Sequence, residues 1–192
     1  MKKIIVVAGL IAFSQTASAH TGLLPTDGFS HGFQHPFLGL DHFLAMLGLG
    51  LWASSQSRRL AKQAIGLFLL FMTAGALLGL AGFGFAYVET AILVSLVSVG
   101  IALSFGTAKL PKTVILASIA AFASMHGLAH GSEMPVAASA YAYIAGIVSG
   151  TAVLHFSGLA LGLIARRVNA IGLIRVYGTL TGMIGAWLLF AA

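Results

Sequence analysis

Residues 35–55, HPFLGLDHFLAMLGLGLWASS, are apolar enough to cross a membrane, yet this stretch opens with His35, Asp41 and His42. The hydrocarbon core of a bilayer needs about 20 predominantly apolar residues to span it as a helix. Ionisable side chains inside it cost roughly 3 kcal/mol or more each, and they usually mark a functional pathway. The stretch therefore predicts a membrane-spanning helix that carries a functional group at one end.

The composition of the whole chain indicates a membrane protein. Hydrophobic residues make up 59% of the 192 residues, charged residues make up 7%, and the mean hydropathy is +1.02. Such values lie outside the range of ordinary soluble domains. Cysteine is absent, which excludes disulfides, thiolate metal sites and cysteine nucleophiles.

We expect an all-α fold, an integral membrane bundle of six transmembrane helices. Short links between the apolar segments favour an antiparallel arrangement of neighbours. Pro36 restricts the residue before it to an extended conformation, so we expect the first helix to begin at Pro36 and His42 to lie about 9 Å below its start. The six segments are 36–55, 62–82, 88–107, 111–130, 137–165 and 170–191.

The first nineteen residues, MKKIIVVAGLIAFSQTASA, are typical of a secretory signal peptide. They combine a basic start, a short apolar run and a small-x-small ending at Ala17-Ser18-Ala19. The alternative is an uncleaved first helix. We expect residues 1–19 to be removed and residues 20–192 to form one six-helix transmembrane domain whose N-terminus and C-terminus lie in the periplasm.

All Lys and Arg residues after residue 19 fall in or next to the links on one predicted side of the bundle. The positive-inside rule makes that side cytoplasmic, so the expected location is the cytoplasmic (inner) membrane of a bacterium. This distribution also explains the pI of about 10.1 without nucleic acid as a partner. The basic residues are Arg58, Arg59, Lys62, Lys109, Lys112, Arg166, Arg167 and Arg175.

Glycine pairs four residues apart indicate close helix crossings, either within the bundle or between subunits of a homo-oligomer. The pairs are Gly75/Gly79, Gly146/Gly150, Gly158/Gly162 and Gly178/Gly182.

The histidines and acids gather toward the opposite, periplasmic side. His126 and His130 share one face of the fourth span, and we expect them at a depth similar to that of His42. Asp41 lies about 100° round the helix from His42, so we expect it to orient an imidazole of a neighbouring helix. His155 in the fifth span is the deepest ionisable group. The candidate metal ligands are His20, His31, His35, Asp41, His42, His126, His130, Glu133 and His155.

Imidazole and carboxylate without thiolate suit Ni(II), Co(II) or Zn(II) better than Cu(I), Mg(II) or Ca(II). A divalent metal ion and the lipid bilayer are therefore the expected partners. We expect no prosthetic cofactor, since the metal would be cargo. For His155, a packing role and a metal-binding role are both open. Glu89 and His31 fit a position at the membrane interface.

Three stretches of the sequence resemble those of the HupE/UreJ family of hydrogenase- and urease-accessory permeases. HPFLGLDH at 35–42 has the pattern H-P-x-x-G-x-D-H, HGLAHGSEMP at 126–135 has the pattern H-G-x-A-H-G-x-E-x-P, and LHFSGLALG at 154–162 is similar to that family's fifth span. The resemblance implies uptake of nickel, or cobalt in some members, for metalloenzyme assembly. Zinc is the less favoured ion.

Three functions compete at this point. The first is a permease for a transition metal, not an enzyme, with capture at Asp27, His31, His35 and Glu133. The second is an intramembrane metal-dependent hydrolase with a zinc-bound water and Asp41 or Glu133 as acid or base. The third is a periplasmic sensor or donor of metal. A phosphate-binding loop G-x-x-x-x-G-K-[ST] is absent from the sequence, so the chain carries no such ATP site.

Cleavage after Ala19 would leave His20 with a free α-amino group beside its imidazole, and these two nitrogens can chelate one divalent ion. Inserting one Ala between Ala19 and His20 should lower metal uptake only at limiting metal concentration, because the chelate lies outside the bilayer. Mass spectrometry of the mature N-terminus checks the cleavage. Unchanged uptake at limiting metal would leave the chelate without a role.

Overall fold

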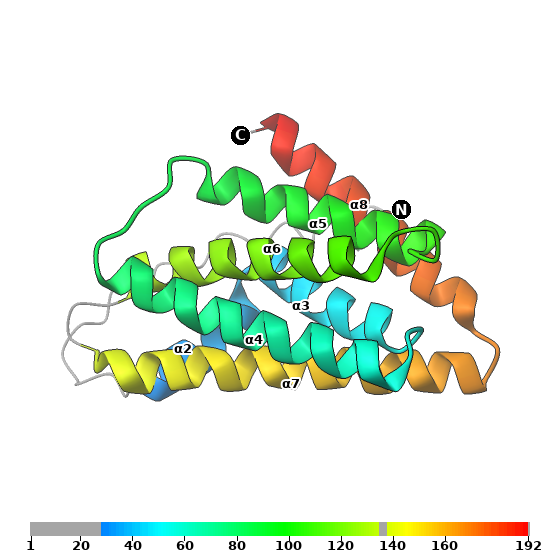
Figure 1. The fold of residues 1–192 in the computed structure, drawn as a ribbon, viewed down its shortest axis with the longest axis horizontal. Coiled ribbons are helices and arrows are strands. Elements are labelled where there is room, and N and C mark those ends of the chain that lie inside the picture. The colour runs from blue at the N-terminus through cyan, green and yellow to red at the C-terminus, as the bar shows by residue number, and fades with distance from the viewer. Residues whose placement is uncertain (1–27, 135–137, 192) are drawn as a thin grey trace, which may run out of the picture.

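The computed structural model describes residues 28–134 and 138–191, and these residues form helices joined by short links (Figure 1). The predicted all-α class is confirmed for this part of the chain. The signal peptide, His20 and Asp27 lie outside the described residues, so the division into 1–19 and 20–192 stays a prediction. The helices are α2 (Gly28–Leu38), α3 (Leu40–Ala53), α4 (Arg58–Leu80), α5 (Val88–Phe105), α6 (Lys112–Ser132), α7 (Ala140–Arg167) and α8 (Ile171–Ala191).

Five of these helices, α4 to α8, are each long and apolar enough to cross a membrane. Helices α2 and α3 pass the same test only together, and they meet at a bend of 82°. The described residues thus hold five spans, or six if the bent pair counts as one. The last five predicted segments agree with α4 to α8 to within a few residues.

The prediction that the first helix begins at Pro36 is wrong. Pro36 lies inside α2, and the chain breaks at Gly39, whose backbone is extended with φ −83° and ψ 119°. A proline near the end of a helix removes one backbone hydrogen bond, while a glycine offers the break at little steric cost. Since α3 begins at Leu40, His42 lies about 3 Å below its start instead of about 9 Å.

Glycine faces divide the bundle into three closely packed units. Helix α4 packs on α6, α5 packs on α8, and α7 packs on both halves of the bent pair. A Cβ atom added at Gly127 of α6 would meet the backbone of Met72 in α4. A Cβ atom at Gly100 of α5 would meet Gly182 of α8 at 2.5 Å. Backbones approach this closely only where both helices present small residues.

All four predicted glycine pairs lie at such crossings inside one chain. Gly75 and Gly79 face α6, and Gly178 and Gly182 face α5. The two pairs of α7 face α2 and α3 in turn. The pairs are therefore explained without a second subunit, and a homo-oligomer stays a prediction.

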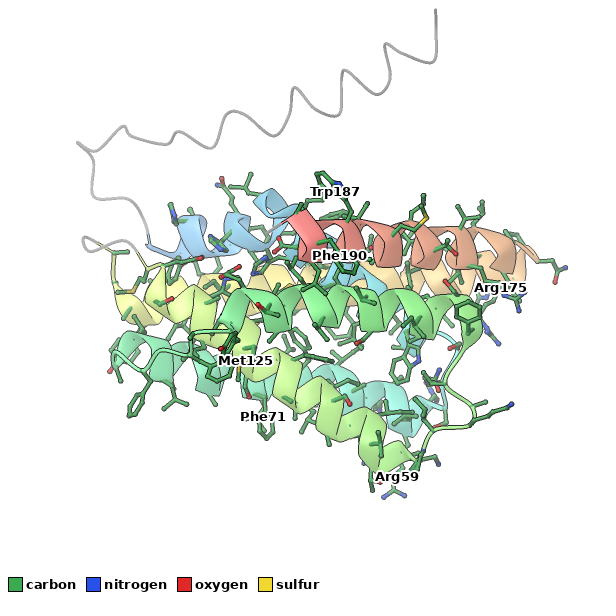
Figure 2. The ribbon with its side chains drawn as sticks, turned by 90° about the horizontal axis from the view of Figure 1, so that it is seen from above. Arg59, Phe71, Met125, Arg175, Trp187 and Phe190 are labelled. Atoms are coloured by element: carbon green, nitrogen blue, oxygen red, sulfur yellow. The ribbon has the colours of Figure 1, made fainter. Side chains whose placement is uncertain are left out.

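The basic residues gather at one end of the bundle. Arg59 at the start of α4 and Arg175 in α8 lie at the same end of the molecule (Figure 2). Lys112 begins α6, and Arg166 and Arg167 end α7, so these groups share that end. The histidine-bearing ends of α3 and α6 lie at the other end.

Replacing Gly75 with Ala should lower the stability of the bundle by about 1–3 kcal/mol, the usual cost of overpacking. The added Cβ would meet the backbone oxygen of Ser124 and, at 3.0 Å, the amide nitrogen of Leu128. Gly66→Ala on the same helix is the matched control, because its Cβ would find no atom within 4 Å. Thermal unfolding in detergent checks both variants. Equal midpoints would contradict the packing described here.

Candidate metal site

Two imidazoles lie on either side of the break between α2 and α3. In a straight helix, His35 and His42 would be separated by about 10.5 Å along the axis. The bend at Gly39 instead brings their ring centroids to 6.0 Å, edge to face. The break therefore converts two positions seven residues apart into neighbours.

Helix α6 adds two more imidazoles at the same depth. The ring centroid of His42 lies 5.2 Å from that of His126 and 4.7 Å from that of His130. The ring of His35 lies 4.8 Å from His130. The prediction that these helices bring histidines together is confirmed. We call His35, His42, His126 and His130 the histidine cluster.

Glu133 closes the outer side of the histidine cluster. Its Oε2 lies 3.4 Å from Nε2 of His35. Ligand atoms of His35, His130 and Glu133 all lie within 4.8 Å of one another, a spacing that one metal ion could bridge after small side-chain movements. Glu133 is half-exposed at the end of α6, and its hydrogen bond with His35 lowers the pKa of its carboxyl group. This acid therefore stays ionised at neutral pH.

Asp41 contacts the imidazole next to it in sequence. Its Oδ1 lies 2.9 Å from Nδ1 of His42, so it accepts the Nδ1 proton. The prediction that Asp41 orients an imidazole of another helix is wrong, because at the first turn of α3 both side chains fold back toward Gly39. The contact leaves the lone pair of His42 on Nε2, which is buried without a hydrogen-bond partner. A carboxylate that holds a histidine in this tautomer is a common support for a metal ligand.

His126 is held in the same tautomer by the backbone. Its Nδ1 donates to the carbonyl oxygen of Phe122 at 2.9 Å, and its Nε2 is buried without a partner. His130 has no hydrogen-bond partner on either nitrogen and is fully buried. A buried polar atom without a partner costs about 1–3 kcal/mol. A metal ion bound between these nitrogens would remove that cost.

His155 lies deeper than the cluster, as predicted, and does not contact it directly. The ring of Phe68 stands between them, with its centroid 5.8 Å from His126 and 4.8 Å from His155. Both ring nitrogens of His155 are buried without a hydrogen-bond partner. The structure thus places His155 as a separate nitrogen donor beyond Phe68.

His31 is not part of the histidine cluster. It is exposed on α2, with its ring 6.0 Å from that of Tyr143. Tyr143 of α7 also faces His35, at 6.4 Å, and its hydroxyl group is buried without a partner. Sequence reasoning missed Tyr143 and Phe68, because an aromatic residue in an apolar helix has no signature that separates it from ordinary packing. Glu89 is exposed at the start of α5.

Comparisons with known proteins show the family of the chain. The model of the HupE / UreJ protein family matches residues 8–188. Protein HupE of Rhizobium leguminosarum bv. viciae is 35% identical over 189 residues, which cover 97% of each chain. The chain belongs to the HupE/UreJ family. No solved structure matches it.

The charges of the site in this HupE/UreJ chain suit a divalent cation. The imidazoles described above offer nitrogen donors, and Asp41 and Glu133 supply two negative charges beside them. No Lys or Arg of the described residues lies at this end of the helices. A dication bound here would therefore have its charge balanced locally, which a low-dielectric site requires.

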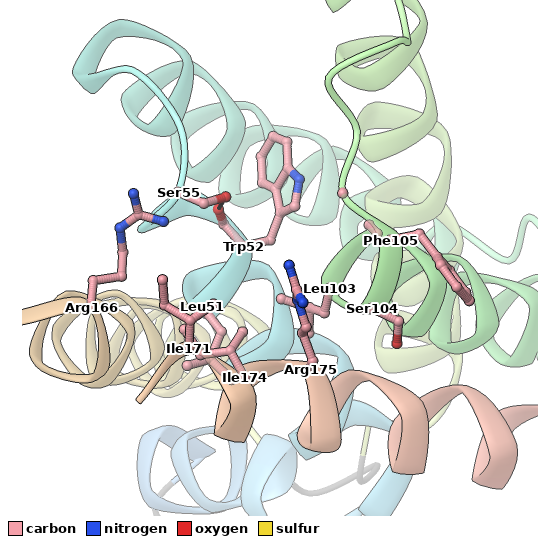
Figure 3. A pocket seen from close by; sticks show the side chains of 12 residues that line it. Leu51, Trp52, Ser55, Leu103, Ser104, Phe105, Arg166, Ile171, Ile174 and Arg175 are labelled. Atoms are coloured by element: carbon pink, nitrogen blue, oxygen red, sulfur yellow. Dashed lines mark hydrogen bonds between the residues drawn. The ribbon is translucent and has the colours of Figure 1, made fainter. Parts of the chain in front are cut away.

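The opposite end of this HupE/UreJ chain has a different character. A cavity of about 160 Å³ there is lined by Trp52, Ser55, Arg166 and Arg175, among apolar side chains (Figure 3). The Trp52 indole donates from Nε1 to Oγ1 of Thr107 at 3.1 Å, which ties α3 to the link after α5. The two ends of the bundle thus carry opposite charge.

Asp41→Asn should weaken metal binding by about 10–100-fold, the usual effect of losing a partner that orients a metal ligand. The amide keeps the shape of the side chain but loses the negative charge beside His42. Equilibrium dialysis with Ni(II) in detergent measures the change. The same substitution in a His42→Ala background should cause little further loss. Additive losses in the double variant would show that Asp41 acts independently of His42.

Proposed function

We propose that the chain is a permease that carries Ni(II), or Co(II), from the periplasm to the cytoplasm for metalloenzyme assembly. The observation that supports this most strongly is the set of buried, unpartnered nitrogens on His42, His126 and His130. Two helices converge to present them, while the other ring nitrogens of His42 and His126 are occupied by Asp41 and Phe122. Packing alone gives no reason to bury such nitrogens.

The direction follows from the charge at the two ends. The basic end would face the cytoplasm by the positive-inside rule, and the histidine cluster, the mature N-terminus and the C-terminus would then lie on the periplasmic side of the inner membrane. A dication that moves toward an inside-negative potential gains about 4.6 kcal/mol per 100 mV, twice the value for one charge. That gain corresponds to a concentration ratio of roughly two thousand.

The proposed route has three stages. Capture would use His35 and Glu133 at the outer edge, with His31 nearby and His20 and Asp27 in the N-terminal segment. The ion would then bind among the imidazoles of the histidine cluster. From there it would pass the Phe68 ring toward His155, whose two unpartnered nitrogens favour a path through the bundle over a single closed site.

The choice of nickel or cobalt over zinc as cargo rests on the motifs and not on the donor atoms. Imidazole nitrogen binds all three ions, and Zn(II) favours a closed tetrahedral set of ligands. The resemblance of the HPFLGLDH and HGLAHGSEMP motifs to hydrogenase- and urease-accessory permeases adds nickel as the first choice. The hydrolase and sensor hypotheses account less well for His155, which lies beyond the cluster.

Single Ala substitutions at His42, His126 and His130 should each lower Ni(II) uptake by at least about tenfold. The reason is that losing even a residue that only hydrogen-bonds a metal ligand usually lowers metal affinity by about that factor. Purified protein in sealed liposomes with an imposed inside-negative potential measures uptake of Ni(II), Co(II) and Zn(II). His31→Ala is the control, because His31 is exposed outside the cluster, and we expect a loss only at limiting metal.

Two results would refute the proposal. One is a wild-type chain that binds Ni(II) but moves no metal at any potential, which would favour the sensor or the hydrolase. The other is wild-type uptake in the His126→Ala and His130→Ala variants.

A further inference from the structure

Two thioethers and a hydroxyl group from three different helices meet in the middle of the bundle. Thr151 of α7 shares its hydroxyl proton between Sδ of Met46 in α3, at 3.2 Å, and Sδ of Met72 in α4, at 3.6 Å. The exposed fractions of the three residues are 0%, 0% and 1% for Thr151, Met46 and Met72. We call these three residues the sulfur layer.

The sulfur layer lies between the histidine cluster and His155. Met46 follows His42 by one turn of α3, and Thr151 precedes His155 by one turn of α7, each a rise of about 6 Å. Since α3 and α7 both lead away from the histidine end, the layer is about one turn below His42 and one turn above His155, and Met72 packs against Gly127, the residue after His126. The layer therefore borders the proposed route from the histidine cluster to His155.

The hydrogen bonds of Thr151 differ from those of two other threonines in these helices. Thr73 donates to the carbonyl oxygen of Leu69 at 2.7 Å, and Thr179 donates to that of Arg175 at 3.0 Å. This bond to the preceding turn is the usual solution for threonine in a transmembrane helix. Thr151 instead donates to sulfur, a weak acceptor, so its oxygen points into the layer.

We infer that Met46, Met72 and Thr151 form a second cation-binding position that passes borderline and soft metal ions and rejects Mg(II) and Ca(II). The inference rests on the proposed function, since it assigns the ion selectivity of the same route. In the structure the three side chains contact one another and fill the layer. Methionine is flexible and polarizable, so its sulfur can turn toward an arriving ion.

Ligand preference explains the selection. Mg(II) and Ca(II) take oxygen ligands, and Mg(II) gives up its water reluctantly, so two thioethers cannot replace its hydration shell. Thioether sulfur binds softer transition-metal ions, and one imidazole from the neighbouring turn would complete a mixed nitrogen and sulfur set. The sulfur layer carries no charge, so it does not attract dications in general. It discriminates by the softness of the ion.

The test replaces both sulfurs with carbon at nearly constant volume, in the double variant M46L/M72L. Ni(II) uptake into sealed liposomes under an imposed potential should fall by about tenfold, which corresponds to about 1.4 kcal/mol of lost stabilisation. Ni(II) binding to the histidine cluster, measured by equilibrium dialysis in detergent, should stay within about twofold of the wild type, because its ligands are intact. M183L is the matched control, since Met183 is 63% exposed on the outside of α8.

A second readout does not depend on transport. Ag(I), a soft ion that accepts thioether ligands, is added to the detergent-solubilised protein, and bound silver is counted by elemental mass spectrometry. The wild type and M183L should each bind one equivalent more than M46L/M72L. If the wild type binds this extra silver but moves no Ni(II), the proposed function fails and the sulfur site stands. Wild-type Ni(II) uptake or unchanged silver binding in M46L/M72L overturns the inference.

Discussion

Backbone contact between α7 and the bent pair α2–α3 is the constraint on which the candidate site depends. Gly146 and Gly150 of α7 touch the backbone of Phe29 and Phe33 in α2, and Gly158 touches α3 at Leu47. A side chain at any of these glycines would push one half of the bent pair away. Helix α7 therefore packs on both sides of the break at Gly39 and fixes how the two halves of the bent pair lie relative to each other.

The bend determines the chemistry of the outer end. Because α2 and α3 turn by 82° at Gly39, His35 and His42 can both face α6. Asp41, next to the break, reaches Nδ1 of His42 and leaves the other nitrogen of that ring turned away. A straight helix would instead place His35 about 10.5 Å from His42 along the helix axis. One glycine therefore links the path of the backbone to the geometry of four imidazoles.

Donor character changes with depth along the axis of the bundle. The outer edge has a carboxylate and a partly exposed imidazole, the next level has buried imidazoles, and the level below has two thioethers with one hydroxyl group. Charged oxygen donors attract any dication, whereas neutral nitrogen and sulfur donors retain only ions that bind them well. A route with this order would collect cations broadly at its mouth and select among them inside.

Periodicity and composition by themselves determined much of this protein. The all-α class, the positions of α4 to α8, the single basic end and the convergence of His42 with His126 and His130 all follow from hydropathy, charge and the helical repeat. The bend at Gly39, the bond between Asp41 and His42, and the meeting of Met46 with Thr151 do not. These features depend on which helices lie in backbone contact. A local sequence pattern shows which face of a helix is apolar. Only tertiary packing decides which other helix that face contacts and at which glycine the helix is interrupted.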